Sequence, residues 1–351
     1  MKAWAVVRHS EPLECIEVKR PEPTGTEVVV GVEACGVCHS DLHFWKGVYN
    51  MGGGKVLTLA DRGVTLPRAP GHEIAGRVVA AGPDATGVTV GERYVVYPWI
   101  GCGHCEHCLN EDDNLCASQS SIGVVRHGGF ASEVVAPHPR YLVPLGGLDP
   151  ALASTFACSG ITVYSAIQKI MPMPPDKPIV LIGAGGLGLA AISMLRAFDH
   201  RAIISVDIDP AKRQAALDLG ATAAVDGTGD DVAQRIIAAA GGPVDAVIDF
   251  VNASATAAAG MGALAKGGTL VNVGVAGGEL TLSLAGMVFR ALSVMGSNTG
   301  SVKDLRAVMA LAQSGKLPPL PVTRFQKDDA NLAMQQLKAG EITGRAVLVD
   351  S

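Results

Sequence analysis

The feature that most constrains the fold of this chain is a regular alternation, beginning near Lys177, of short Val- and Ile-rich segments with Ala- and Leu-rich segments. Strands that alternate with helices build a parallel sheet covered on both faces, so the alternation predicts a doubly wound α/β fold. Strands of this kind are almost continuously apolar, which accounts for a mean hydropathy of +0.30. The expected strands are Ile179–Ile182, Ala202–Val206, Ala223–Val225, Ala246–Ile248 and Thr269–Val273, and the expected helices lie near Leu187–Phe198, Pro210–Leu219, Asp231–Ala240 and Ala255–Leu264.

The first third of the chain differs, because its β-branched segments are bounded by Gly and Pro. We expect strands at Val28–Val32, Ile74–Val79 and Arg93–Val96. Connections as long as those at 47–70 and 98–122 usually carry function or are held by a crosslink such as a bound metal. The tail after Ser297 is expected to hold helices at Val302–Ala312 and Asp328–Ala339 and strands near Leu320–Arg324 and Ala346–Val349.

Charge and hydropathy exclude several classes of function. The 351 residues carry 28 Lys and Arg against 33 Asp and Glu, a net charge of −5 without long blocks of one sign. The sequence therefore lacks the concentrated positive charge by which proteins bind nucleic acid or an anionic membrane. The N-terminus has no secretory signal, and the apolar stretch Ile179–Leu195 is too short and too glycine-rich to span a bilayer. We therefore expect a soluble, cytoplasmic protein.

A glycine motif follows the first expected strand of the alternating region. Gly183, Gly185 and Gly188 form G-x-G-x-x-G, in which the glycines allow a tight turn, close approach of a pyrophosphate and close helix packing. The following helix N-terminus offers N–H groups to phosphates. Asp207 ends the next strand, where a carboxylate binds the adenosine ribose and repels the 2′-phosphate of NADP, so we predict NAD. Lys212 is placed to reach the ribose or phosphate; the alternatives are a helix N-cap for Asp207 and a surface position for Lys212.

Four of the eight cysteines come from one loop. Their spacing suits a closed tetrahedral zinc site, and a four-iron cluster is the alternative. Disulfides are disfavoured in a chain without a secretion signal. His104 and His107 lie in the same loop as substitute ligands. The predicted structural zinc ligands are Cys102, Cys105, Cys108 and Cys116.

A second set, Cys38, His72 and Cys158, is scattered along the chain. Three such ligands and a water would form an open, catalytic zinc site. Taken singly, Cys38 fits a buried small residue and His72 a core histidine better than metal ligands, so the metal interpretation needs a wider pattern.

These motifs occur in a fixed order along the chain: Cys38-His-Ser-Asp41, Gly71-His-Glu73, the four-cysteine loop, Cys158-Ser-Gly-Ile-Thr162, the glycine motif and Asp207. In this combination the chain resembles the zinc-dependent medium-chain alcohol dehydrogenases, and in particular their bacterial and archaeal NAD-dependent branch. The resemblance implies a GroES-like β-rich catalytic domain at 1–157 with a structural zinc lobe at about 98–122, a Rossmann NAD-binding domain at 158–297, and a return to the first domain at 298–351. It also implies a homotetramer.

The resemblance further implies a reaction, the interconversion of primary or secondary alcohols, aromatic ones included, with aldehydes or ketones by hydride transfer with NAD. Two Zn²⁺ ions per subunit are implied, one catalytic and held by Cys38, His72 and Cys158, where it acts as a Lewis acid. Ser40 matches the hydroxyl that passes the substrate proton, and His43 the outer base of the relay. Asp41 matches a carboxylate that orients His72, and Glu73 a group that tunes the metal.

The same resemblance assigns contacts to the cofactor and the substrate. His39 and Arg345 match phosphate contacts, with solvent exposure and a terminal surface arginine as the alternatives. Trp99 matches a residue that covers the substrate, with core packing as the alternative. The other implied positions are Gly186 and Leu187 in the phosphate loop, Val251, Val273 and Val275 beside the nicotinamide, and Phe44 and Ile122 in the substrate pocket.

One segment departs from the family pattern, and two rival functions stay open. Tyr49–Gly63 is longer than the stretch many members have before Gly-His-Glu, and we expect it to shape the pocket entrance or an oligomer contact. One alternative is a polyol dehydrogenase of the same superfamily, although these enzymes often have glutamate at the position of Cys158. The other is an NAD-binding protein that zinc stabilises and that has no catalytic activity. The Ser40 and His43 pair argues against the second, because a structural zinc needs no proton relay.

Overall fold

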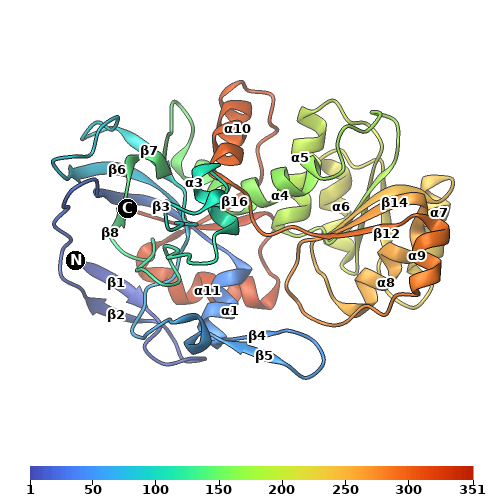
Figure 1. Ribbon diagram of the computed structural model, residues 1–351, viewed down its shortest axis with the longest axis horizontal. Helices are drawn as coiled ribbons and strands as arrows, with labels where there is room; N and C mark the ends of the chain where they lie inside the picture. The colour runs from blue at the N-terminus through green and yellow to red at the C-terminus, as the bar shows by residue number, and fades with distance from the viewer. Residues whose placement is uncertain (351) are drawn as a thin grey trace.

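The computed structural model describes residues 1–350 and divides them into two parts, each built on one large sheet (Figure 1). Both chain ends lie in the part built on what we call the mixed sheet. This sheet has the order β16-β17-β3-β6-β7-β9, with β8 paired to β3. Its strands are β3 (Val28–Val37), β6 (Glu73–Ala81), β7 (Arg93–Val96), β8 (Glu133–Ala136), β9 (Leu142–Pro144), β16 (Val322–Gln326) and β17 (Arg345–Val349).

The other part is built on a six-stranded sheet, the parallel sheet, with the order β12-β11-β10-β13-β14-β15. Because β10 and β13 are neighbours, the direction of winding reverses between them, and ligands of such folds bind at that switch point. Its strands are β10 (Ile179–Ile182), β11 (Ile203–Asp207), β12 (Ala223–Asp226), β13 (Val244–Asp249), β14 (Leu264–Asn272) and β15 (Ser293–Gly296).

Helices cover both faces of the parallel sheet because successive side chains of a strand point to opposite faces. Ile179 and Leu181 of β10 belong to one buried cluster, whereas Val180 and Ile182 belong to a second. The helices of this part are α5 (Gly186–Ala197), α6 (Pro210–Asp218), α7 (Val232–Ala240), α8 (Ser254–Ala263) and α9 (Leu284–Arg290); the others are α1 (His39–Lys46), α2 (Glu106–Leu109), α3 (Pro150–Ser154), α4 (Ser159–Gln168), α10 (Val302–Gln313) and α11 (Ala330–Ala339).

The tail of the chain returns to the mixed sheet. Strand β17 runs antiparallel to β3, with Ala346 opposite Val37, and β16 runs parallel to β17. This pairing brings the start of β17 beside the end of β3, directly before Cys38. The predicted domain limits at 157 and 297 agree with this strand membership but stay a prediction.

The predicted α/β class is confirmed, and the predicted elements of the alternating region all exist. Strand Ile179–Ile182 coincides with β10, and the other four strands differ from their predicted bounds by a few residues. Strand β15 was not predicted, because Ser293–Gly296 is short, half-exposed and carries no alternating pattern.

Two small hairpins complete the fold, β1 (Lys2–Ala5) with β2 (Glu14–Glu17), and β4 (Val48–Asn50) with β5 (Val56–Thr58). The second hairpin lies within the long segment noted in the sequence and extends toward the part built on the parallel sheet (Figure 1). Within residues 1–350 no single helix has the length and apolar character to cross a bilayer; the bent pair Pro150–Ala157 and Ser159–Gln168 passes that test by length and composition only.

Candidate active site

Three elements bring Cys38, His72 and Cys158 together. Cys38 follows β3 and caps α1, His72 directly precedes β6, and Cys158 precedes α4. One donor atom from each lies within 4.8 Å of the other two. His72 and Cys158 are buried, and Cys38 is half-buried.

The chemistry of this cluster fits a metal ion. Nδ1 of His72 lies 3.3 Å from Oδ1 of Asp41, and the buried Nε2 has no hydrogen-bond partner. Asp41 also accepts hydrogen bonds from the backbone N–H groups of Cys38 (2.8 Å) and Gly71 (3.0 Å), so it orients two of the three donors. A hydrogen bond from Cys158 lowers the pKa of the Cys38 thiol well below its usual value. Two sulfur ligands and an imidazole whose other nitrogen is held by a carboxylate are a typical zinc set.

Glu73 and Arg345 form a buried ion pair beside this cluster. Glu73 is 0% and Arg345 4% exposed, so Arg345 is not the surface arginine of the alternative interpretation. Burial raises the pKa of Glu73 to about 7 against the opposing charge of Arg345. The other oxygen of Glu73 accepts from the backbone N–H of Ser159, at 3.2 Å. The Arg345 side chain also packs on the phosphate loop, since a Cβ placed on Gly186 would lie 2.9 Å from its Cδ.

Ser40 and His43 lie on α1, one turn apart, so both project from the same face of the helix that begins at Cys38. Both side chains are half-buried. The ring of His43 stacks on Tyr49, with 5.1 Å between centroids and 22° between planes. Burial, and then the charge of Lys46, lower the pKa of His43. Tyr49 begins the segment that the sequence analysis expects at the pocket entrance, but its stacking on His43 was not predicted.

The predicted substrate-pocket residues are buried to different degrees around the cluster. The Trp99 ring lies 5.3 Å from the His72 ring, and its Nε1 is buried without a partner. Phe44 and Ile122 are 2% and 0% exposed and belong to the main hydrophobic core. Trp99 therefore borders the metal cluster, whereas contact of Phe44 or Ile122 with a substrate stays a prediction.

The four-cysteine loop also fits a metal. Sγ of Cys108 lies 3.5 Å from Sγ of Cys105 and 3.9 Å from Sγ of Cys102, and all four thiols lie within 4.8 Å of one another. Tetrahedral zinc–sulfur bonds of about 2.3 Å place sulfur atoms about 3.8 Å apart, whereas a disulfide needs about 2.05 Å. Nδ1 of His104 is instead occupied by the carbonyl of Cys102, at 3.0 Å.

The glycine motif is built for close approach. Gly183 has φ = +96°, and a Cβ on Gly188 would lie 1.9 Å from the Gly183 carbonyl oxygen, so each position requires glycine. A Cβ on Gly185 would meet nothing within 4 Å, which leaves the backbone open to a ligand. Asp207 ends β11 and accepts from the backbone N–H groups of Ala184 (2.7 Å) and Asp209 (2.9 Å). Leu187 lies in the first turn of α5.

The remaining predicted cofactor residues surround this motif. Val251 lies against the first glycine, since a Cβ on Gly183 would be 2.9 Å from its Cγ2. Val273 and Val275 follow β14, and Val275 is 49% exposed. Lys212 lies in the first turn of α6 and is half-buried, and His39 is exposed at the start of α1.

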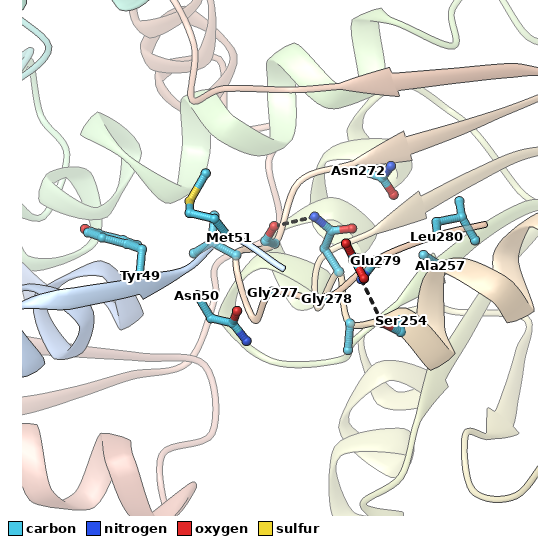
Figure 2. A pocket seen from close by; sticks show the side chains of 14 residues that line it. Tyr49, Asn50, Met51, Ser254, Ala257, Asn272, Gly277, Gly278, Glu279 and Leu280 are labelled. Atoms are coloured by element: carbon cyan, nitrogen blue, oxygen red, sulfur yellow. Dashed lines mark hydrogen bonds between the residues drawn. The ribbon is translucent and has the colours of Figure 1, made fainter. Parts of the chain in front are cut away.

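Figure 2 shows a pocket of about 340 Å³ where the β4–β5 hairpin meets loops of the parallel sheet. Tyr49, Asn50 and Met51 line one side, and residues after β13 and β14 line the other. A Cβ on Gly52 would lie 2.6 Å from the carbonyl oxygen of Gly278, so the hairpin tip directly abuts the second part. The long segment thus reaches the side of the site where Val275 lies.

The fold and the site define a two-part oxidoreductase with a nucleotide-binding sheet and two metal-fitting clusters. Two family models match the chain, "Alcohol dehydrogenase GroES-like domain" at residues 24–147 and "Zinc-binding dehydrogenase" at residues 186–314. The chain belongs to the zinc-dependent medium-chain alcohol dehydrogenase family.

Three relatives illustrate the range of this family. The chain is 35% identical to an NAD-dependent alcohol dehydrogenase of Sulfurisphaera tokodaii, covering 99% of this chain and 100% of the relative. It is 32% identical to a D-arabinose 1-dehydrogenase (NADP(+)) of Saccharolobus solfataricus, covering 99% and 97%. The crystal structure of an alcohol dehydrogenase from Aeropyrum pernix superposes with a TM-score of 0.89 at 28% identity, covering 99% and 100% of the two chains.

Proposed function

We propose that this protein oxidises primary or secondary alcohols, aromatic ones included, to aldehydes or ketones, and catalyses the reverse reductions, with zinc and NAD. The observation that carries the proposal is the buried Cys38, His72 and Cys158 cluster at the start of the helix that bears Ser40 and His43. The NAD-dependent alcohol dehydrogenases among the relatives support it over the full chain length.

Each metal cluster has its own task in this proposal. Cys38, His72 and Cys158 would hold a catalytic zinc, which supplies Lewis acidity and so eases loss of the alcohol proton. Asp41 holds His72 through Nδ1, which fixes the imidazole plane and directs Nε2 into the cluster. The four-cysteine loop would hold a second zinc that pins the loop; its four thiols leave no position for a substrate.

The side chains of α1 handle the proton. The Ser40 hydroxyl accepts the proton of the substrate alcohol and passes it outward, and His43 takes it up as the outer base of the relay. Because its pKa is lowered by burial, His43 is neutral, and so able to accept a proton, at neutral pH.

The cofactor preference rests on Asp207. Its two oxygens are fixed by the N–H groups of Ala184 and Asp209, which places the carboxylate at the edge of the phosphate loop. A carboxylate there accepts hydrogen bonds from ribose hydroxyls and repels a 2′-phosphate, which favours NAD. Gly185, Gly186 and Leu187 would hold the pyrophosphate, with His39, Lys212 and Arg345 as further contacts to the phosphates or ribose and Val251, Val273 and Val275 beside the nicotinamide.

We further propose a homotetramer in the cytoplasm. Leu284, Val288 and Phe289 of α9 are 83%, 75% and 76% exposed, and β15 beside them is the last strand of its sheet. Exposed apolar patches and open sheet edges favour association with a second copy, which light scattering on the purified protein tests. Zinc-binding thiolates must stay reduced, which favours a cytoplasmic location.

Turnover tests the proposal. Zinc-loaded protein is mixed with NAD and primary, secondary, aromatic and polyol substrates, and NADH absorbance is recorded. We expect the highest kcat/KM with simple alcohols. The D-arabinose 1-dehydrogenase among the relatives makes sugars and polyols the second candidate, and a preference for them would replace our substrate class. Absence of turnover with every substrate at alkaline pH would leave only a non-catalytic NAD-binding protein.

A further inference from the structure

A pocket of about 280 Å³ lies on the mixed-sheet part, and none of its lining residues belongs to the metal-fitting clusters. Its lining includes Arg68, Arg126, His127, Lys19 and one carboxylate, that of Glu133. Neither the proposed reaction nor any motif of the sequence uses these residues.

The positive groups of this pocket lack a counter-charge. Glu133 is committed to Arg20, which lies 2.7 Å from its Oε1. Among residues 1–350, neither Arg68 nor Arg126 forms an ion pair, and the buried Nε of Arg68 has no hydrogen-bond partner. Burial lowers the pKa of Arg68, as expected for a desolvated and uncompensated guanidinium.

The same groups are held in place by neutral partners. Arg68 donates to Oγ1 of Thr65 (3.2 Å), and Nε of Arg126 donates to Oγ of Ser120 (3.0 Å). His127 accepts the backbone N–H of Ala69 at Nδ1 (3.2 Å), so its Nε2 carries the ring proton and is a donor. The two guanidinium groups and the imidazole ring are thus fixed in place, and each keeps N–H groups that donate to no protein acceptor. Such an arrangement binds oxyanions.

We propose that Arg68, Arg126 and His127 form a binding site for a small oxyanion of the phosphate type. Arg68 lies four residues before His72, on the segment that leads to it. Residues 121–130 and 69–72 are joined by backbone hydrogen bonds from Gly128 to Ala69 (2.9 Å) and from Gly129 to Gly71 (2.8 Å). An anion shared by Arg68 and Arg126 adds a further link between these two segments, so its binding stabilises the folded protein.

Inorganic phosphate is the probe. The thermal midpoint of zinc-loaded protein is measured against phosphate at constant ionic strength, with chloride as the balancing salt, and calorimetric titration gives the affinity. We expect a saturable rise with phosphate. Arg126→Gln and Arg68→Gln are each expected to weaken binding about tenfold or more, because each removes charged hydrogen bonds. Glu133→Gln should tighten binding, because it removes the one carboxylate in the lining.

Arg201→Gln is the matched control, since Arg201 pairs with Asp176 on the surface of the other part and should leave phosphate affinity unchanged. A phosphate effect no larger than that of chloride would overturn the site, and so would unchanged affinity in both arginine variants.

Discussion

The ion pair of Glu73 and Arg345 offers a sharp test of how the tail of the chain is held to the start of β6. Arg345→Met keeps an apolar stem of similar length but leaves the Glu73 carboxylate, 0% exposed, without its cation. Removing one partner of a buried pair costs about 3–5 kcal/mol, because the remaining carboxyl group stays desolvated, loses its cation and must take up a proton or remain charged without compensation. Removing both charges, in Arg345→Met with Glu73→Gln, should restore much of that loss.

The expected change in melting temperature follows from the size of the chain. Unfolding entropy is about 2.1 cal/mol/K per residue near 60 °C, which gives roughly 0.7 kcal/mol/K for 351 residues. A loss of about 3–5 kcal/mol therefore lowers the thermal midpoint by about 4–7 °C. The double variant should melt above Arg345→Met.

Scanning calorimetry of zinc-loaded protein at neutral pH measures these shifts. The control is Arg324→Met, which breaks the exposed pair of Arg324 and Asp149 (2.8 Å) and should move the midpoint by less than about 2 °C. If Arg345→Met moved the midpoint no more than the control, or if the two substitutions were additive, the buried pair would not be a coupled element of the fold.

Three further predictions concern the proposed roles. Asp207→Ser should raise the ratio of kcat/KM with NADP to that with NAD, and an unchanged ratio would remove Asp207 from the ribose site. Cys116→Ser should lower the zinc content from two to about one ion per chain by metal analysis; retention of both ions would exclude this loop as a site. Burial lowers the pKa of His43, so its neutral form persists below pH 6.5. The acid limb of kcat should therefore lie below that pH and disappear in His43→Gln, and a wild-type profile in the variant would refute the relay.

Local patterns allowed much of the parallel-sheet part to be predicted. The run Ile179–Ile182 followed by the glycine motif specifies a strand, a tight turn and a helix within a few residues, and all three are found. The four-cysteine loop is similarly local, since its ligands lie within one connection. Such features are predictable because short-range sterics and ligand spacing decide them.

The cluster of Cys38, His72 and Cys158 was predictable only through the family resemblance. Nothing in the spacing of Cys38, His72 and Cys158 requires them to meet; they meet because β3 pairs with β6 and the short helix Thr155–Ala157, directly before Cys158, packs on β6. The pairing of Glu73 with Arg345 depends on the tail, which returns to pair β17 with β3. Long-range partners of this kind are set by sheet topology, which periodicity does not encode.

The β4–β5 hairpin lies in the segment that departs from the family pattern, and its packing bears on the geometry of the proposed site. Gly52 and Gly277 are points of close contact between this hairpin and the part built on the parallel sheet, since a Cβ on Gly277 would lie 2.6 Å from the carbonyl oxygen of Asn50. Tyr49, one residue earlier, stacks on His43 and lines the same pocket as Val275 (Figure 2). The distance between the proposed relay base and the proposed nicotinamide side is therefore set partly by how closely this hairpin packs on the opposite loop. Both contact points are glycines at positive φ. The two backbones approach this closely because neither residue has a side chain to keep them apart.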